Sequence, residues 1–512
     1  MSRKQRPPAD GEIRTLVDSY LEEQQRLQTP VARFASEFES GTPPALASVY
    51  RDLIPLSAPA PGQQYAFEVE LDACTGCKAC VAACHALNGL DETEAWRDTG
   101  VVLGGTAEAP FQQTVTTACH HCADPACLNG CPVLAYEKDP HTGIVRHLDD
   151  QCIGCQYCVL KCPYDVPKYN ARLGIVRKCD MCHQRLAVGE APACVQACPT
   201  QAIRIVTVQV TRTETVQVDT SAFLGVAPDP SYTQPTTRYV SARQPPANLH
   251  AADAGTLRLQ DPHWPLAVML TLLPAAIGLQ WARAESIAAT ARIPGWTPLA
   301  LGIAGMTAAF FHLGQPWRAW RVFLGLRRSW FSREVVLLGA WLGLSVLDLV
   351  TPVVRPVTAV IGGLGLVCSV MIYVDTRRTF WAFRRTAPQF LGAALVCGLA
   401  IPFPLATASV LVVRMGWEAF GLRGQSASAR LQRGPLRTVT TARYVLGAVA
   451  TAFFCLAAIG GGHAAACWIA LGMTIAGELA DRHIFFRVVD APKMPGMPAE
   501  VASPLGDEML AA

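Results

Sequence analysis

The segment CTGCKACVAACH, residues 74–85, carries four cysteines with the spacing C-x2-C-x2-C-x3-C. The segment CIGCQYCVLKCP, residues 152–163, repeats that spacing. Two further sets lengthen the middle gap, one to four residues and the other to eleven. In sequence order the four sets are Cys74, Cys77, Cys80 and Cys84; Cys119, Cys122, Cys127 and Cys131; Cys152, Cys155, Cys158 and Cys162; Cys179, Cys182, Cys194 and Cys198.

This spacing is that of the bacterial-type [4Fe–4S] ferredoxins. A cubane cluster has four irons that each take one thiolate, and a two-residue interval lets one turn present successive sulfurs to neighbouring irons. In two-cluster ferredoxins the fourth cysteine of a run binds the other cluster, and a proline follows it. Pro132, Pro163 and Pro199 follow three of the sets, and His85 takes that place in the first. Four runs therefore predict two such units, with four [4Fe–4S] clusters.

Two other uses of cysteine fit this pattern less well. Structural zinc sites use C-x2-C pairs that a longer gap separates. Disulfides need an oxidising compartment, and we expect no cleavable secretory signal at this N-terminus. Iron–sulfur binding is therefore the prediction.

Residues 66–205 resemble the iron–sulfur subunit of the dimethyl sulfoxide reductase group of molybdopterin oxidoreductases. The resemblance is carried by CHHCADPACLNGCP (119–132), CIGCQYCVLKCPYDVPKYN (152–170) and KCDMCHQRLAVGEAPACVQACP (178–199). In that family the outer two sets pair with each other, and so do the inner two. The resemblance thus implies a first cluster on Cys74, Cys77, Cys80 and Cys198; a second on Cys179, Cys182, Cys194 and Cys84; a third on Cys119, Cys122, Cys127 and Cys162; and a fourth on Cys152, Cys155, Cys158 and Cys131.

Some polar residues near the sets have two interpretations. His120 and His121 could tune a cluster by hydrogen bonds to sulfur, or could simply be satisfied by other partners. Lys161, Lys168 and Lys178 could offset the negative charge of clusters, or could be solvated.

Composition changes sharply along the 512 residues. The net charge is only +3, which does not indicate nucleic acid. After residue 263, acidic residues become few and apolar runs dominate, and a bilayer core about 30 Å thick needs roughly 20 apolar residues per helix. The predicted spans are 264–282, 296–314, 335–351, 357–374, 389–413, 443–460 and 463–480.

Arginine clusters predict the orientation of these spans, because cytoplasmic loops are rich in Lys and Arg. The loops 315–334 and 375–388 then lie in the cytoplasm of a bacterium, and so does the cluster domain. The arginine-rich loop 414–443 would lie outside with seven simple crossings. A break of 389–413 at Pro402 and Pro404 would return it to the cytoplasm, although that segment looks too short for two spans. We therefore expect seven or eight helices in the inner membrane.

The predicted fold class is α+β: a double ferredoxin-type domain followed by an all-α polytopic transmembrane domain. The expected divisions are a helical extension and linker (1–63), the four-cluster domain (64–210), a connector (211–262), the membrane domain (263–487) and a C-terminal tail (488–512). An apolar stripe predicts an amphipathic helix at 10–28, and Thr29-Pro30 predicts the start of a second.

The membrane half resembles the anchor subunit of the same reductase group. FHLGQPWRAW (311–320), SWFSREVV (329–336), MIYVDTRRTFW (371–381) and GELADRHIFF (477–486) carry this resemblance. In that family the histidine and the glutamate of the first two pieces are associated with quinol binding, which implies His312 and Glu334. Alternatively, His312 is an interfacial anchor and Glu334 follows a Ser332 helix cap. Asp348, Glu478 and Arg482 are weaker candidates. Cys368, Cys397, Cys455 and Cys467 have no ligand spacing.

Together these features predict an electron-transfer and membrane-anchor subunit. It would oxidise membrane quinol and pass electrons through four clusters to a separate molybdopterin catalytic subunit, since we expect no substrate-reducing site in this chain. Three alternatives stay open: reverse flow from a partner that oxidises formate or a sulfur compound, a cluster-driven ion-translocating unit, and a polyferredoxin with an inert anchor.

Overall fold

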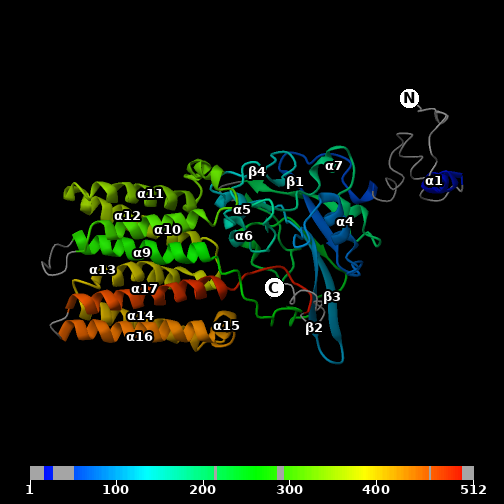
Figure 1. The fold of residues 1–512 in the computed structure, drawn as a ribbon. Helices are drawn as coiled ribbons and strands as arrows, with labels where there is room; N and C mark the ends of the chain where they lie inside the picture. The colour runs from blue at the N-terminus through cyan, green and yellow to red at the C-terminus, as the bar shows by residue number, and fades with distance from the viewer. Residues whose placement is uncertain (1–15, 27–50, 213–215, 285–292, 460–462, 499–512) are drawn as a thin grey trace.

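The computed structural model describes residues 16–26, 51–212, 216–284, 293–459 and 463–498. A domain of short strands, short helices and loops lies at one end of a bundle of long helices (Figure 1). This arrangement confirms the predicted α+β class, with a ferredoxin-like domain followed by a helical membrane domain.

Small sheets frame the cysteine loops of the first domain. β1 (Gln63–Glu70) lies between an antiparallel neighbour, β8 (Ile203–Gln209), and a parallel one, β11 (Arg238–Val240). β2 (Asp98–Gly105) and β3 (Pro110–Thr117) form a long hairpin, whose edge pairs with β12 (His250–Ala251). Three smaller hairpins complete the strands: β4 (Tyr136–Lys138) with β5 (Val145–His147), β6 (Lys168–Asn170) with β7 (Ile175–Arg177), and β9 (Thr211–Arg212) with β10 (Val216–Gln217).

The helices of this domain are short, and cysteine–proline pairs end two of them, α5 and α6. Cys131 and Cys162 have extended backbone angles, as residues before proline usually do, so their helices end one residue earlier. These helices are α4 (Ala79–Asn88), α5 (Ala126–Gly130), α6 (Tyr157–Lys161), α7 (His183–Ala187) and α8 (Ala193–Gln196).

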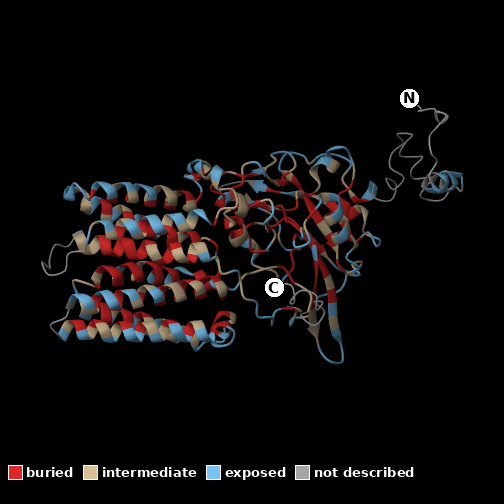
Figure 2. Ribbon diagram, in the orientation of Figure 1, coloured by how far each residue is buried: buried red, intermediate tan, exposed pale blue. Residues whose placement is uncertain are grey.

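Within the described residues, eight helices form the bundle. They are α9 (Trp264–Ala284), α10 (Trp296–Phe310), α11 (Trp330–Leu347), α12 (Arg355–Val374), α13 (Phe383–Leu399), α14 (Pro404–Leu422), α16 (Arg437–Ile459) and α17 (His463–Arg487), with the short α15 (Ala427–Arg433) between α14 and α16. Six are long and apolar enough to cross a membrane, whereas α10 and α13 are shorter. Buried residues line the middle of the bundle and exposed ones its outside (Figure 2). The protein is therefore a multi-pass membrane protein.

The predicted fifth span, 389–413, is two helices rather than one. α13 ends at Leu399 and α14 begins at Pro404, so the break falls at the predicted prolines. α13 begins six residues before the apolar run and α14 continues nine residues past it. Of the two, only α14 is long and apolar enough to cross a membrane, so the count of seven or eight spans stays a prediction. Buried Glu478 pairs with Arg414, the arginine that seems to end the run.

Arg414 shows how a charged residue can lie inside one of these apolar helices. The sequence predicts it in an arginine-rich loop, but it lies inside α14, where it donates hydrogen bonds of 2.9 and 3.1 Å to Glu478 of α17. Arg443 of α16 and Arg482 of α17 also contact Glu478, each at 3.3 Å. Charges in a membrane interior are found mostly in such pairs. The cluster joins α14, α16 and α17.

A second buried ion cluster lies at the opposite end of the bundle. The Asp348 carboxylate accepts hydrogen bonds from Gln280 at 3.0 Å and Arg355 at 2.7 Å, and also from Arg283. It joins α9, α11 and the start of α12. Asp348 and Glu478, both named above as weaker candidate site residues, are thus paired with arginines.

At the N-terminus, α1 (Leu16–Arg26) lies within the predicted helix 10–28, with Leu16 and Tyr20 exposed. Figure 1 shows it apart from the rest of the protein. The predicted second helix, after Thr29, lies outside the described residues.

The eight-helix arrangement makes a testable prediction about the 423–436 segment. Gln425 is exposed and should lie on the same side of the membrane as the cysteine domain, because an even number of helices separates them. A Gln425→Cys variant should therefore react with a membrane-impermeant maleimide only from that side. Val353→Cys, between α11 and α12 and 84% exposed, should react only from the other side. Labelling of both from one side would contradict this topology.

Candidate functional site: four cysteine sites and a membrane pocket

Cysteines distant in sequence meet around common cavities. Three cavities are each lined by four cysteines: Cys74, Cys77, Cys80 and Cys198; Cys119, Cys122, Cys127 and Cys162; Cys131, Cys152, Cys155 and Cys158. We call them the first, third and fourth sites. In each, three cysteines come from one run and the fourth from its partner run. Among the described His, Cys, Asp and Glu side chains, no group of three is close enough to hold a single metal ion. The four thiols instead surround a space.

The remaining four cysteines form the second site where α4 packs against α8. Burial, together with the nearby thiols of Cys194 and Cys182, raises the pKa of Cys84 to about 12. The Cys179 thiol is near Cys84 and Cys194 as well. Cluster ligands must be thiolates, so protons leave such buried thiols when metal binds. The donor set at all four sites, with four thiols in a partly or fully buried space, suits a [4Fe–4S] cluster.

One backbone feature recurs in all four sets. The residue before the second cysteine has a left-handed conformation: Gly76 (φ 72°), His121 (φ 40°), Gly154 (φ 69°) and Met181 (φ 59°). This turn directs amides toward sulfur, since Gly154 N–H lies 3.4 Å from Cys152 Sγ and Met181 N–H 3.4 Å from Cys179 Sγ. At Gly154 a side chain is doubly excluded, because a Cβ would also lie 2.3 Å from the Gly174 carbonyl oxygen.

The polar residues near the sets divide between the two interpretations. His120 Nδ1 lies 2.9 Å from Thr237 Oγ1, and His121 Nδ1 accepts a hydrogen bond of 3.1 Å from Val145 N–H, so neither contact is to sulfur. Lys168 pairs with Asp165 near the surface. Lys178, by contrast, is buried and donates to the carbonyls of Val145 and Cys179.

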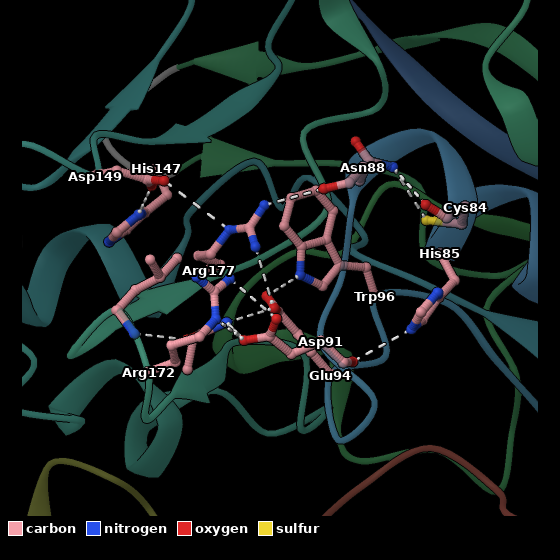
Figure 3. Close-up of polar contacts among 12 residues, drawn as sticks. Cys84, His85, Asn88, Asp91, Glu94, Trp96, His147, Asp149, Arg172 and Arg177 are labelled. Atoms are coloured by element: carbon pink, nitrogen blue, oxygen red, sulfur yellow. Dashed lines mark hydrogen bonds and ion pairs between the residues drawn. The ribbon is translucent and has the colours of Figure 1, made fainter.

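A polar network supports the second site from outside (Figure 3). Asn88, at the end of α4, donates toward Cys84 Sγ at 3.6 Å, and Arg177 of β7 donates to the Asn88 carbonyl at 3.2 Å. Arg177 also pairs with buried Glu94 at 3.2 Å. At its edge, exposed Arg172 pairs with Asp91. The network fixes α4 against the β6–β7 hairpin.

The two quinol candidates, His312 and Glu334, line one pocket at the end of the bundle. His312 lies two residues beyond α10, and Glu334 lies in the second turn of α11. Both are buried, and the Ser369 hydroxyl of α12 donates a hydrogen bond to Glu334. Burial and neighbouring His263 lower the pKa of His312 to about 4, so its ring is neutral near pH 7. Ser332 does not cap α11, which begins at Trp330.

Cys155 of the fourth site also lines this pocket, together with Tyr157, Tyr373 and a largely apolar wall. The pocket has a volume of about 60 Å³. That is small for a quinone ring, so entry requires flexible wall residues such as Met269 and Met306 to move. The pocket is thus an apolar cavity that contains two groups able to accept protons, His312 and Glu334, and one cysteine of the fourth site.

The anchor motifs hold the cysteine domain in place. Arg318, in the 3₁₀ helix Pro316–Gly325, donates to the carbonyls of Asp149 and Cys152 at 2.9 and 3.2 Å. Arg378 donates to Leu160 and Val159 at 3.0 and 3.3 Å. Further contacts of this kind are Gln315 N–H to Ile153 O, Ser329 to Gly130 O, Ser332 to Pro132 O, and the Lys161–Asp375 ion pair.

Sequence reasoning missed two residues of this region. Tyr157 lies between two cysteines of the fourth site, and its hydroxyl donates to Ile372 O of α12 at 3.0 Å. Arg97 is buried among cysteines of two sites. Tyr157 is part of a segment already recognised, but its partner is more than 200 residues away. Arg97 lies outside every cysteine run, so no spacing indicates it.

Comparison with known proteins agrees with both halves. The family described as 4Fe-4S dicluster domain matches residues 111–208, and the DMSO reductase anchor subunit (DmsC) family matches residues 295–398. The B subunit of the anaerobic dimethyl sulfoxide reductase of Haemophilus influenzae is 36% identical over 182 residues, which cover 34% of this chain and 87% of that protein. The corresponding B subunit of Escherichia coli K12 is 38% identical over 148 residues, with 27% and 72% coverage. The formate dehydrogenase-O iron-sulfur subunit of E. coli K12 is 36% identical over 152 residues, with 26% and 50% coverage.

The four sites predict which cysteine substitutions affect the same cluster. Cys194 and Cys198 are only four residues apart in sequence but belong to different sites. Cys194→Ser should therefore alter the same electron paramagnetic resonance (EPR) signal as Cys84→Ser, and Cys198→Ser the same signal as Cys74→Ser, in dithionite-reduced protein. If Cys194→Ser and Cys198→Ser alter one common signal instead, the sites are divided differently.

Proposed function

The chain belongs to the family of dimethyl sulfoxide reductase iron–sulfur subunits and carries the anchor subunit of that enzyme fused to it, and from this premise we propose that it oxidises membrane quinol. Electrons would pass through four [4Fe–4S] clusters, at the sites defined above, to a separate molybdopterin-containing subunit. The cysteine domain would face the cytoplasm from the bacterial inner membrane.

One observation carries this proposal: Cys155 lines the same pocket as His312 and Glu334. Oxidation of a quinol releases two protons and two electrons, and a cluster accepts one electron at a time, so the site needs two proton acceptors and an electron acceptor within reach of one ring. In this pocket, His312 takes the proton of one hydroxyl group and Glu334 takes that of the other, while the electrons leave one after the other to the fourth site. The apolar wall keeps the ring away from bulk water.

The order of the sites follows from the elements that join neighbouring sites and from the cysteines of different sites that lie close together. From the pocket, the fourth site adjoins the third through α5 and α6, because each helix contains a cysteine of one site and is followed directly by a cysteine of the other. The third adjoins the second, where Cys119 is near Cys179. The second adjoins the first, where Cys80 is near Cys194. When bound, clusters at such sites supply one-electron transfer. Cys77, an exposed residue, brings the first site to the surface, where a catalytic partner would receive electrons.

The reverse direction is the second candidate, and one comparison favours it. A formate dehydrogenase iron-sulfur subunit is among the relatives, and in such a complex electrons would run from the partner to quinone. The same pocket would serve both directions. Cluster potentials distinguish them: a fourth cluster well above the quinone couple favours quinol oxidation, and one well below it favours quinone reduction.

Two substitutions test the pocket. His312→Ala and Glu334→Gln should each slow cluster reduction by a short-chain quinol about 100-fold, the usual effect of removing a proton acceptor. The EPR signals of dithionite-reduced protein should stay unchanged, because no cluster ligand is altered. His483→Ala is the matched control: this histidine stacks on Trp264 near the same end of the bundle but does not line the pocket. Unchanged quinol oxidation by His312→Ala would remove His312 from the mechanism.

The catalytic partner can be sought directly. Full-length protein, tagged and extracted anaerobically in mild detergent, should co-purify with one large subunit whose mass spectrum and pterin content identify a molybdopterin enzyme. An intact preparation without such a subunit would instead favour a free-standing electron carrier.

A further inference from the structure

Arg97 is a buried cation for which the described residues provide no carboxylate. It precedes β2 and is only 2% exposed. Its Nη1 donates to Thr116 Oγ1 at 3.2 Å, and its guanidinium carbon lies 4.7 Å from the centre of the Phe67 ring. Its Nη2 has no hydrogen-bond partner among the described residues.

Such an arrangement is costly unless an anion is close. Arginine stays protonated throughout the physiological pH range, so it cannot avoid the cost by losing its proton. Moving a charge from water into a protein interior without a partner is strongly unfavourable. A contact with one aromatic face and one hydroxyl compensates only in part. The surroundings of Arg97 must therefore supply negative charge.

The neighbours that can do so are cysteines of two different sites. The guanidinium lies near Cys194, Cys84 and Cys179, all of the second site. It is also near Cys80 of the first site. Thr116 connects Arg97 to the first site, because its Oγ1 contacts Arg97 Nη1 and lies 3.5 Å from Cys80 Sγ. Arg97 thus lies between the first and second sites.

We propose that Arg97 is the shared counter-ion of the first and second cluster sites and raises the reduction potentials of both clusters. A cluster held by four thiolates has a net negative charge, which would compensate the positive charge of the Arg97 guanidinium. A fixed positive charge favours the state with one more electron. Electrons entering from the membrane pocket are thereby drawn to the end of the path where Cys77 reaches the surface.

The test is a potentiometric titration followed by EPR, on the full-length protein with the partner that co-purifies. The substitutions Cys74→Ser and Cys84→Ser assign the signals of the two sites. In Arg97→Gln, the ratio of reduced to oxidised cluster at a fixed potential should fall about tenfold at both sites, equivalent to about 59 mV for a one-electron couple. The third and fourth clusters should be unaffected. In Arg97→Lys, which keeps the positive charge, the reduction potentials of both clusters should stay close to those of the wild-type protein.

Arg172→Gln is the matched control, because it removes the same charge from an exposed surface pair with Asp91. If Arg97→Gln shifts the first two clusters no more than this control does, the proposal is wrong. If Arg97→Gln assembles neither cluster but Arg97→Lys assembles both, the need for positive charge is supported. If both variants lose them equally, Arg97 acts through its shape and the proposal is overturned.

This inference rests on the proposed function only in requiring clusters at the first and second sites. Dithionite replaces quinol in the titration, so an error in the quinol pocket would not change the result. Iron content short of four clusters, or signals absent from the wild-type protein, would contradict the proposed function itself.

Discussion

The structure depends on the close contact between the fourth cysteine site and the end of the helix bundle. Electrons can pass from a lipid-soluble carrier to a cluster only if both approach one another closely. Gly314 allows this approach, since a Cβ there would lie 2.2 Å from the Gly174 carbonyl oxygen. Around it, Arg318 and Arg378 donate to backbone carbonyls beside the cysteines rather than to side chains. Hydrogen bonds between a charged group and the backbone fix the position of the cysteine loops themselves. The anchor motifs therefore position the electron path as well as attach it.

Buried charges are compensated differently in the two halves of the protein. Within the bundle, Glu478 and Asp348 pair with arginines from neighbouring helices, whereas Glu334 accepts a hydrogen bond from the Ser369 hydroxyl. At the boundary between the halves, Lys161 of α6 pairs with Asp375 at 2.5 Å. In the cysteine domain, buried Arg97 and Lys178 instead lie beside thiols, where acids would repel a negatively charged cluster. Arg97 and Lys178, buried cations that lie beside thiols, are therefore found along the row of cysteine sites.

Much of this organisation could be predicted from sequence because it rests on local spacing. The cysteine runs, the apolar segments and the prolines at 402 and 404 act over a few residues, and they indicated the fold class and the break in the fifth span. The error at Arg414 had a different cause. Its partner, Glu478, lies in another helix, so the arginine looked like the start of a loop. Tyr157 and Arg97 escaped prediction for the same reason, since contacts with Ile372 and with cysteines of two runs exist only in the folded chain.

The fusion of the two halves in one chain adds to the contacts that hold them together. The chain joins the cysteine domain to α9 through the connector before Trp264. It also returns from α17 to that domain: Lys493 pairs with Asp253, Gly496 N–H donates to Asp253 at 3.1 Å, and Val101 N–H donates to the Gly496 carbonyl at 3.1 Å. The covalent connector raises the effective concentration of one half near the other, and the segment after α17 adds these non-covalent contacts. Apolar packing of Val322 and Phe331 against the cysteine domain also supports this interface. Its hydrogen bonds orient the fourth site over the pocket that His312 and Glu334 line.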